Sequence, residues 1–117
     1  MTDSLEIDGA QAAALLAGDP APVLLDVRED YERAAGRIPG SLHIPLAELP
    51  QRAGELPPGS SVIVYCRAGM RSLMAAQALN AGGYQALSLA GGMLDWAAAE
   101  RPLEPPGGTV ADHGQPT

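Results

Sequence analysis

The chain contains no lysine, no phenylalanine and only one cysteine among its 117 residues. A single cysteine excludes an internal disulfide, a paired-cysteine redox motif and a zinc site built from several thiolates. The absence of lysine excludes chemistry through a lysine Schiff base. Aromatic residues make up 3% of the chain while hydrophobic residues make up 46%, so aliphatic side chains and alanine must fill the core. We therefore expect no metal and no cofactor.

Positive charge is also scarce. Seven arginines face 14 acidic residues, and the formal net charge is −7. This balance argues against a general nucleic-acid surface. The N-terminal residues 1–4 are polar and acidic, with neither a basic segment nor a long apolar run after them. The sequence thus predicts no signal peptide, no membrane span and a cytoplasmic location.

Short apolar runs alternate with segments of helical character along the chain. Its length suits one domain, which we place at residues 4–103, followed by a disordered tail rich in proline and glycine at residues 104–117. Apolar and β-branched runs indicate strands, and alanine- and leucine-rich segments indicate helices. The expected strands are 5–7, 23–27, 41–44, 62–65 and 84–89, and the main expected helices are 10–17, 72–82 and 93–100.

This alternation predicts an α/β fold, with a five-stranded, mostly parallel sheet and helices on both faces. Right-handed crossovers place the carboxyl ends of parallel strands at one edge, where open sheets bind ligands. Four residues of possible function lie at or just after the carboxyl ends of strands and should gather near that edge: Asp26, Arg28, His43 and Cys66.

The lone cysteine stands between a buried strand and a helix. A loop in this position directs backbone N–H groups toward the helix N-terminus, which favours an anion. Arg67 and Arg71 add positive charge in an otherwise acidic chain, so we expect the sulfur of Cys66 to be held as an anion. The alternative is a structural cysteine packed at the end of a core strand. That alternative does not explain the two arginines and Gly69 that follow within five residues.

Five motifs occur in order along the chain: residues 24–29, 36–41, 43–46 and 66–72, and Gly91-Gly92 followed by Trp96. Together they resemble a single-domain rhodanese, a thiosulfate-type sulfurtransferase, over about residues 4–103. The resemblance implies a rhodanese-like fold with Cys66 as the nucleophile that carries a persulfide. It also implies a loop that binds the outer sulfur and the donor, made of Arg67, Ala68, Gly69, Met70, Arg71 and Ser72.

Two positions depart from the family pattern: Arg37 stands where histidine is frequent, and His43 where asparagine is common. Both positions look structural in the family, and we expect His43 to serve packing. Asp26 is expected to support the site by bracing its loops through hydrogen bonds. Arg28 is either a supporting site residue or a salt-bridge partner of the acidic residues beside it. The acidic run 29–32 is expected to be a solvated face.

The resemblance implies a two-step transfer of sulfane sulfur. A thiolate at Cys66 attacks a donor such as thiosulfate, and a thiol or cyanide then takes the outer sulfur. Arg71 should direct its guanidinium toward the donor anion. Because the chain has no second cysteine, the acceptor must come from outside, as a small thiol or a thiol on another protein.

Two other functions remain open. Phosphatases and arsenate reductases of the same fold use a cysteine loop one residue longer than the four residues between Cys66 and Arg71, and the shorter loop fits a sulfur atom better than a phosphate. The other alternative is a module that carries or senses sulfur without turnover. The physiological donor, the acceptor and the oligomeric state do not follow from the sequence.

Overall fold

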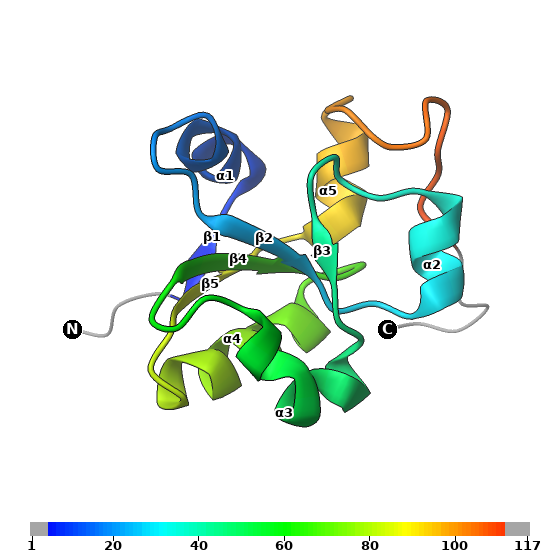
Figure 1. Cartoon of the computed structure of the whole chain (residues 1–117). Helices are drawn as coiled ribbons and strands as arrows, with labels where there is room; N and C mark the ends of the chain where they lie inside the picture. The colour runs from blue at the N-terminus through cyan, green and yellow to red at the C-terminus, as the bar shows by residue number, and fades with distance from the viewer. Residues whose placement is uncertain (1–4, 112–117) are drawn as a thin grey trace.

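The computed structural model describes residues 5–111, and a five-stranded sheet in the order β1-β5-β4-β2-β3 forms its centre (Figure 1). Each neighbouring pair of strands is parallel. This confirms the predicted α/β class, and the sheet is parallel throughout. The strands are β1 (Glu6–Ile7), β2 (Val23–Asp26), β3 (Leu42–His43), β4 (Ser61–Tyr65) and β5 (Gln85–Leu89). The helices are α1 (Gly9–Leu16), α2 (Asp30–Ala35), α3 (Leu49–Arg52), α4 (Met70–Ala81) and α5 (Gly92–Ala98), with 3-10 turns at Leu46–Glu48 and Ala53–Glu55.

Strand β4 occupies the middle of the sheet and is buried on both faces. Val62 and Val64 belong to the apolar layer that includes α4, whereas Ile63 and Tyr65 belong to the layer that includes α1 and α5. Successive side chains of a strand point to opposite faces, so a strand covered on both sides needs an unbroken apolar run. This requirement explains the sequence of β4, which places its carboxyl end firmly at the centre of the sheet.

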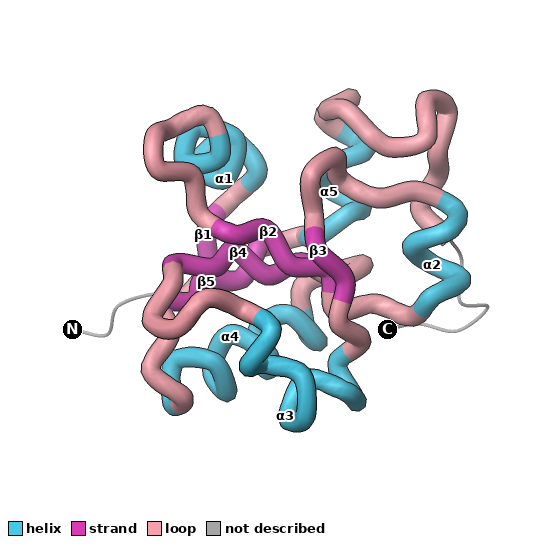
Figure 2. The backbone as a smooth tube through the Cα atoms, in the orientation of Figure 1, coloured by secondary structure: helices cyan, strands magenta, loops and turns pink. Residues whose placement is uncertain are grey.

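Helices cover both faces of the sheet (Figure 2). Helices α1 and α5 lie on one face and α3 and α4 on the other, with α2 beside the β3 edge. Helix α1 begins with a capping box, in which the Asp8 carboxylate accepts from the Gln11 N–H and the Gln11 side chain accepts from the Asp8 N–H. Within the described part of the chain, no helix is long and apolar enough to cross a bilayer.

The segment after α5 packs against the domain, although the sequence predicts a disordered tail over residues 104–117. Glu104 and Arg37 exchange two backbone hydrogen bonds of 2.8 Å in a short antiparallel bridge. The described part of the predicted tail, residues 104–111, is therefore held against the domain. Residues 112–117 lie outside the described residues.

Gly36 is the reason that this segment can approach α2. The Thr109 N–H donates to the Ala35 carbonyl at 2.9 Å, and a Cβ atom at Gly36 would lie 2.8 Å from the Thr109 nitrogen. Val110 then packs against the apolar layer on the α1 and α5 face. Backbone groups make most of these contacts, so the contacts could not be predicted from the proline- and glycine-rich composition of the segment.

Candidate functional site

Cys66 follows the last residue of β4, and three residues separate it from the start of α4. It is 1% exposed. Its Sγ accepts backbone N–H groups from Gly69 at 3.1 Å and from Ser72 at 3.4 Å. Backbone donors at the start of a helix favour an anionic partner. The structure thus places the only thiol of the chain where the sequence predicts an anion site.

Two buried serines support this loop from below. The Cys66 thiol can donate to the Ser72 Oγ at 3.4 Å, and the Ser72 hydroxyl donates to the Gly69 carbonyl at 3.2 Å. Ser88 of β5 places its Oγ 2.7 Å from the Ser72 Oγ. Both serines are 0% exposed. The sequence predicts that Ser72 binds the donor. In the structure, its side chain connects the cysteine loop to Ser88 of β5.

The N-terminus of α5 fixes the carbonyl side of the same loop. The Met93 N–H donates to the Cys66 carbonyl at 2.9 Å, and the Leu94 N–H donates to the Arg67 carbonyl at 3.1 Å. Gly92 has φ +50°, and a Cβ atom there would lie 2.7 Å from the Arg67 oxygen. Only glycine permits both this backbone conformation and this approach. The Gly91-Gly92 motif thus holds the loop from outside while Gly69 and Ser72 hold its sulfur.

Arg71 pairs with a carboxylate that lies 39 positions earlier in the chain. Its Nη1 and Nη2 donate to the two oxygens of Glu32 at 2.8 and 2.9 Å. Glu32 is 1% exposed, so the prediction that residues 29–32 form a solvated face is wrong at this residue. Hydrogen bonding to Glu32 raises the pKa of the Arg71 guanidinium, against a smaller opposing effect of burial. The positive charge expected at the loop is therefore partly cancelled.

Arg67 also turns to another partner. Its Nε donates to the Ala111 carbonyl at 3.1 Å, which ties the cysteine loop to the C-terminal segment. Met70, the first residue of α4, is 66% exposed, and Ala68 is partly buried. The loop therefore presents a methionine side chain and a partly open backbone to solvent.

Asp26 and Arg28 form a buried ion pair, each 0% exposed. The Nε and Nη2 of Arg28 each donate to the Asp26 carboxylate at 2.9 Å, and Nη2 also donates to the Gly36 carbonyl at 2.8 Å. Tyr65, directly before the cysteine, donates its hydroxyl to Asp26 at 3.2 Å. Asp26 thus connects the ends of β2 and β4. Arg28 forms its ion pair with Asp26, which precedes it in the chain, whereas the sequence suggested the acidic residues that follow it.

His43 and Trp96 have structural contacts. The His43 Nε2 lies 2.8 Å from the Arg28 carbonyl. Trp96 is 6% exposed, packs in the layer between α1 and α5, and donates its indole N–H to the Pro102 carbonyl. The contact of His43 is therefore structural, and Trp96 is part of the core.

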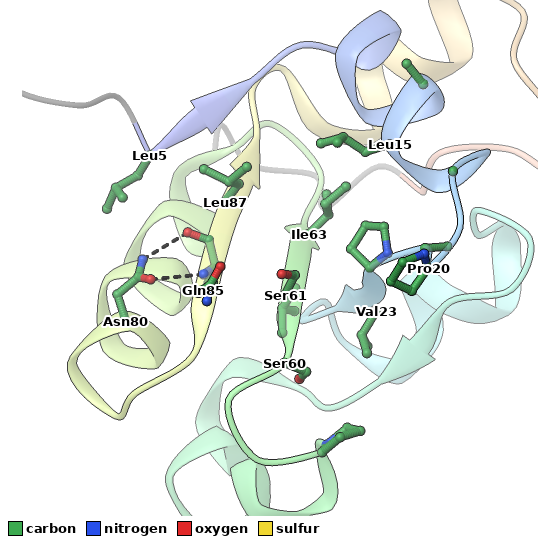
Figure 3. Close-up of a pocket in the computed structure, with 17 residues that line it drawn as sticks. Leu5, Leu15, Pro20, Val23, Ser60, Ser61, Ile63, Asn80, Gln85 and Leu87 are labelled. Atoms are coloured by element: carbon green, nitrogen blue, oxygen red, sulfur yellow. Dashed lines mark hydrogen bonds between the residues drawn. The ribbon is translucent and has the colours of Figure 1, made fainter.

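An apolar cleft of about 860 Å³ lies at the opposite edge of the sheet, where the strands begin (Figure 3). Leu15 from α1, Val23 from β2 and Leu87 from β5 contribute to its wall. None of its described lining residues has an ionisable side chain. Its size is that of a ligand site, but the reactive sulfur stands at the other edge, so the chemistry belongs to the cysteine loop.

Fold and site together define a parallel α/β domain that holds one thiol among backbone N–H groups at the carboxyl edge of its sheet. The Rhodanese-like domain family model matches residues 9–99. The chain is 38% identical over 104 residues to a sulfurtransferase of Allochromatium vinosum, covering 88% of this chain and 97% of that protein. It is 34% identical over 89 residues to the human thiosulfate:glutathione sulfurtransferase, covering 62% and 76% of the two chains.

A solved structure agrees with these sequence matches. The rhodanese-related protein of Thermoplasma volcanium superposes with a TM-score of 0.74 at 32% identity, covering 84% of this chain and 95% of that chain. The chain belongs to the rhodanese-like domain family. It is a sulfurtransferase, and the predicted family is confirmed.

Proposed function

We propose that this protein moves sulfane sulfur from a donor such as thiosulfate to an external thiol or to cyanide, through a persulfide on Cys66. The observation that carries the proposal is the position of the Cys66 Sγ, which accepts N–H groups from Gly69 and Ser72. Thiosulfate as donor and a thiol as acceptor are further supported by similarity to the human relative, whose name states both.

The first step exchanges one sulfur–sulfur bond for another. The Cys66 thiolate attacks the outer sulfur of thiosulfate, and that sulfur's bond to the sulfonate sulfur breaks. Sulfite leaves with the electron pair. The negative charge then rests on the outer sulfur of the new persulfide. The N–H groups at the start of α4 stabilise negative charge in that region because their dipoles are already oriented.

The second step returns the enzyme to its starting state. An acceptor thiolate attacks the outer sulfur, the persulfide bond breaks, and Cys66 leaves as thiolate. The acceptor departs as a persulfide, or as thiocyanate when cyanide is the acceptor. A nucleophilic thiol must remain reduced between turnovers, which favours a cytoplasmic location.

Steady-state turnover tests this function against its two alternatives. We expect sulfite release from thiosulfate, with glutathione or cyanide as acceptor, far above the rate of free thiols, and no release by Cys66→Ser. Stoichiometric loading without turnover would show that the protein is a sulfur carrier or sensor and not an enzyme. Hydrolysis of a phosphate monoester or reduction of arsenate, without sulfur transfer, would replace it by the other cysteine-loop chemistry.

A further inference from the structure

We propose that Glu32 determines the charge of the donor that the cysteine loop prefers, and that it favours donors with one negative charge over those with two. The inference rests on the proposed sulfur transfer and deepens it. Nothing in the sequence around Cys66 suggests this role, because Glu32 lies 34 positions before the cysteine.

The first support is the geometry of the ion pair. The two oxygens of Glu32 receive one N–H each from Nη1 and Nη2 of Arg71, at 2.8 and 2.9 Å. Oε1 also accepts the backbone N–H of Glu29 at 2.9 Å. A carboxylate anion satisfies three donors of this kind, and such charge-assisted pairs are the stronger hydrogen bonds of proteins. Each Nη of Arg71 therefore already gives one N–H to Glu32 before a donor arrives.

The second support is burial. The Glu32 side chain is 1% exposed and that of Arg71 is 24% exposed. Water screens a buried charge far less than an exposed one, so the negative charge of Glu32 acts on any anion that approaches Arg71. Helix α2 holds this carboxylate in place, because buried Arg28 donates to the Glu32 carbonyl as well as to Asp26.

The charge count at the loop then differs from the count in the sequence. Apart from the reacting Cys66 thiolate, which every donor meets alike, Arg67 and Arg71 supply two positive charges, and Glu32, hydrogen-bonded to Arg71, cancels one of them. A thiosulfate dianion meets one uncompensated positive charge, whereas a monoanionic donor such as an organic thiosulfonate or an ionised organic persulfide is matched by it. The preference between donors therefore depends on how well the charge of each donor matches the uncompensated positive charge of the loop. It does not depend on how strongly the loop attracts anions in general.

The test measures kcat/KM for thiosulfate, a dianion, and for benzenethiosulfonate, a monoanion, on the same protein sample. Glu32→Gln removes the negative charge and keeps the size of the side chain. We expect the ratio of thiosulfate to benzenethiosulfonate to rise on the order of three- to tenfold, the effect of one charge in a high effective dielectric constant. Arg71→Gln should lower the ratio, and the double variant should return it close to the wild-type value.

Glu55→Gln is the matched control, because Glu55 forms a two-point pair with Arg52 on the exposed surface. Its ratio should stay at the wild-type value. Partial unfolding cancels in the ratio, since both donors meet the same active fraction. If Glu32→Gln alone does not fold, the ratio of the double variant relative to Arg71→Gln isolates the same charge.

An unchanged ratio in Glu32→Gln, with equal losses for both donors, would overturn the proposal and leave Glu32 as a purely structural residue. A double variant that keeps the low ratio of Arg71→Gln would overturn it as well. Failure of the wild-type protein to turn over either donor would instead contradict the proposed sulfurtransferase reaction, which separates the two claims.

Discussion

At the scale of single residues, Arg71 connects the reactive loop to the stability of the domain. Arg71→Ala would leave the carboxylate of Glu32 buried without its guanidinium partner. We expect the free energy of unfolding to fall by about 2–4 kcal/mol, as for other ion pairs broken on one side in a buried setting. Denaturant unfolding monitored by circular dichroism measures the difference.

Arg52→Ala is the comparison for this prediction. Arg52 pairs with Glu48 and Glu55, whose side chains are 54% and 56% exposed. Ion pairs in contact with water contribute little to stability. Equal destabilisation by Arg71→Ala and Arg52→Ala would show that the Glu32 pair has no special energetic role.

Tyr65 makes the free energy of unfolding depend on pH in the alkaline range. Burial, followed by the charge of Asp26, raises the pKa of its hydroxyl in the folded protein. The folded state then holds this proton to higher pH than the unfolded state. The resulting stability is complete below the unfolded pKa of about 10 and is lost as pH rises through the folded value. Unfolding free energies measured across this range should show the fall.

Tyr65→Phe should remove this part of the pH dependence. At neutral pH it should cost about 1–3 kcal/mol, because the hydroxyl accepts from the Ile38 N–H and donates to Asp26. Tyr31→Phe, at a side chain that is 53% exposed, serves as the control. Parallel loss of stability above pH ~10 in the wild type and in Tyr65→Phe would assign the effect to other groups.

The residues that the sequence could indicate are those whose local context carries the chemistry. Cys66 and Gly69 stand out because a lone thiol, a glycine and a strand–helix junction are adjacent in the chain. Glu32 and Ser88 could not be recognised, since each meets the loop only after the sheet has formed. The apolar residues around Ser88 in β5 indicate that its side chain is buried. The hydrogen-bond partner of its hydroxyl, however, depends on the register of the strands.

At the scale of elements, the start of α5 positions the loop after β4. Gly92→Ala would bring a Cβ atom to 2.7 Å from the Arg67 carbonyl oxygen at φ +50°. We expect the loop to shift, sulfur loading to slow at least tenfold, and stability to fall by about 2–4 kcal/mol from strain and lost contacts. Loading kinetics and thermal unfolding give the two readouts.

Gly59→Ala separates the conformational cost from the contact. Gly59 has φ +70°, and a Cβ atom there would meet no described atom within 4 Å. This variant should lose only the roughly 1–2 kcal/mol of a left-handed conformation and should load sulfur normally. Normal loading by Gly92→Ala as well would mean that α5 does not control the loop.

The boundaries of helices and strands agree most closely with those predicted from the sequence where a single local feature determines them. The β-branched run led to the correct strand β4, and the alanine- and leucine-rich segment 10–17 led to α1, which runs one residue earlier, from Gly9 to Leu16. The start of α4 moved from the predicted residue 72 to Met70, because Gly69 adopts φ +112° and ends the loop earlier. Pro50 stands near the start of α3, where its missing N–H costs nothing.

At the scale of the whole molecule, the C-terminal segment completes the domain. A chain ending at Leu103 would lose the Arg37–Glu104 bridge, the Thr109 hydrogen bond and the packing of Val110. We expect a loss of about 2–3 kcal/mol and a melting temperature lower by roughly 10 °C or more. Arg37→Ala, which keeps the backbone bridge, should lower the melting temperature far less. An unchanged melting temperature in the shortened chain would show that residues 104–111 contribute nothing to folding.

The central claim is that this domain carries sulfur as a persulfide on Cys66. Intact-mass spectrometry after incubation with thiosulfate tests it most directly, because it detects the transferred atom itself. The wild-type protein should gain the mass of one sulfur atom and lose it to an added thiol, while folded Cys66→Ser should gain none. Sulfur on the Cys66→Ser protein, or no gain by the wild type with any sulfane-sulfur donor, would contradict the account.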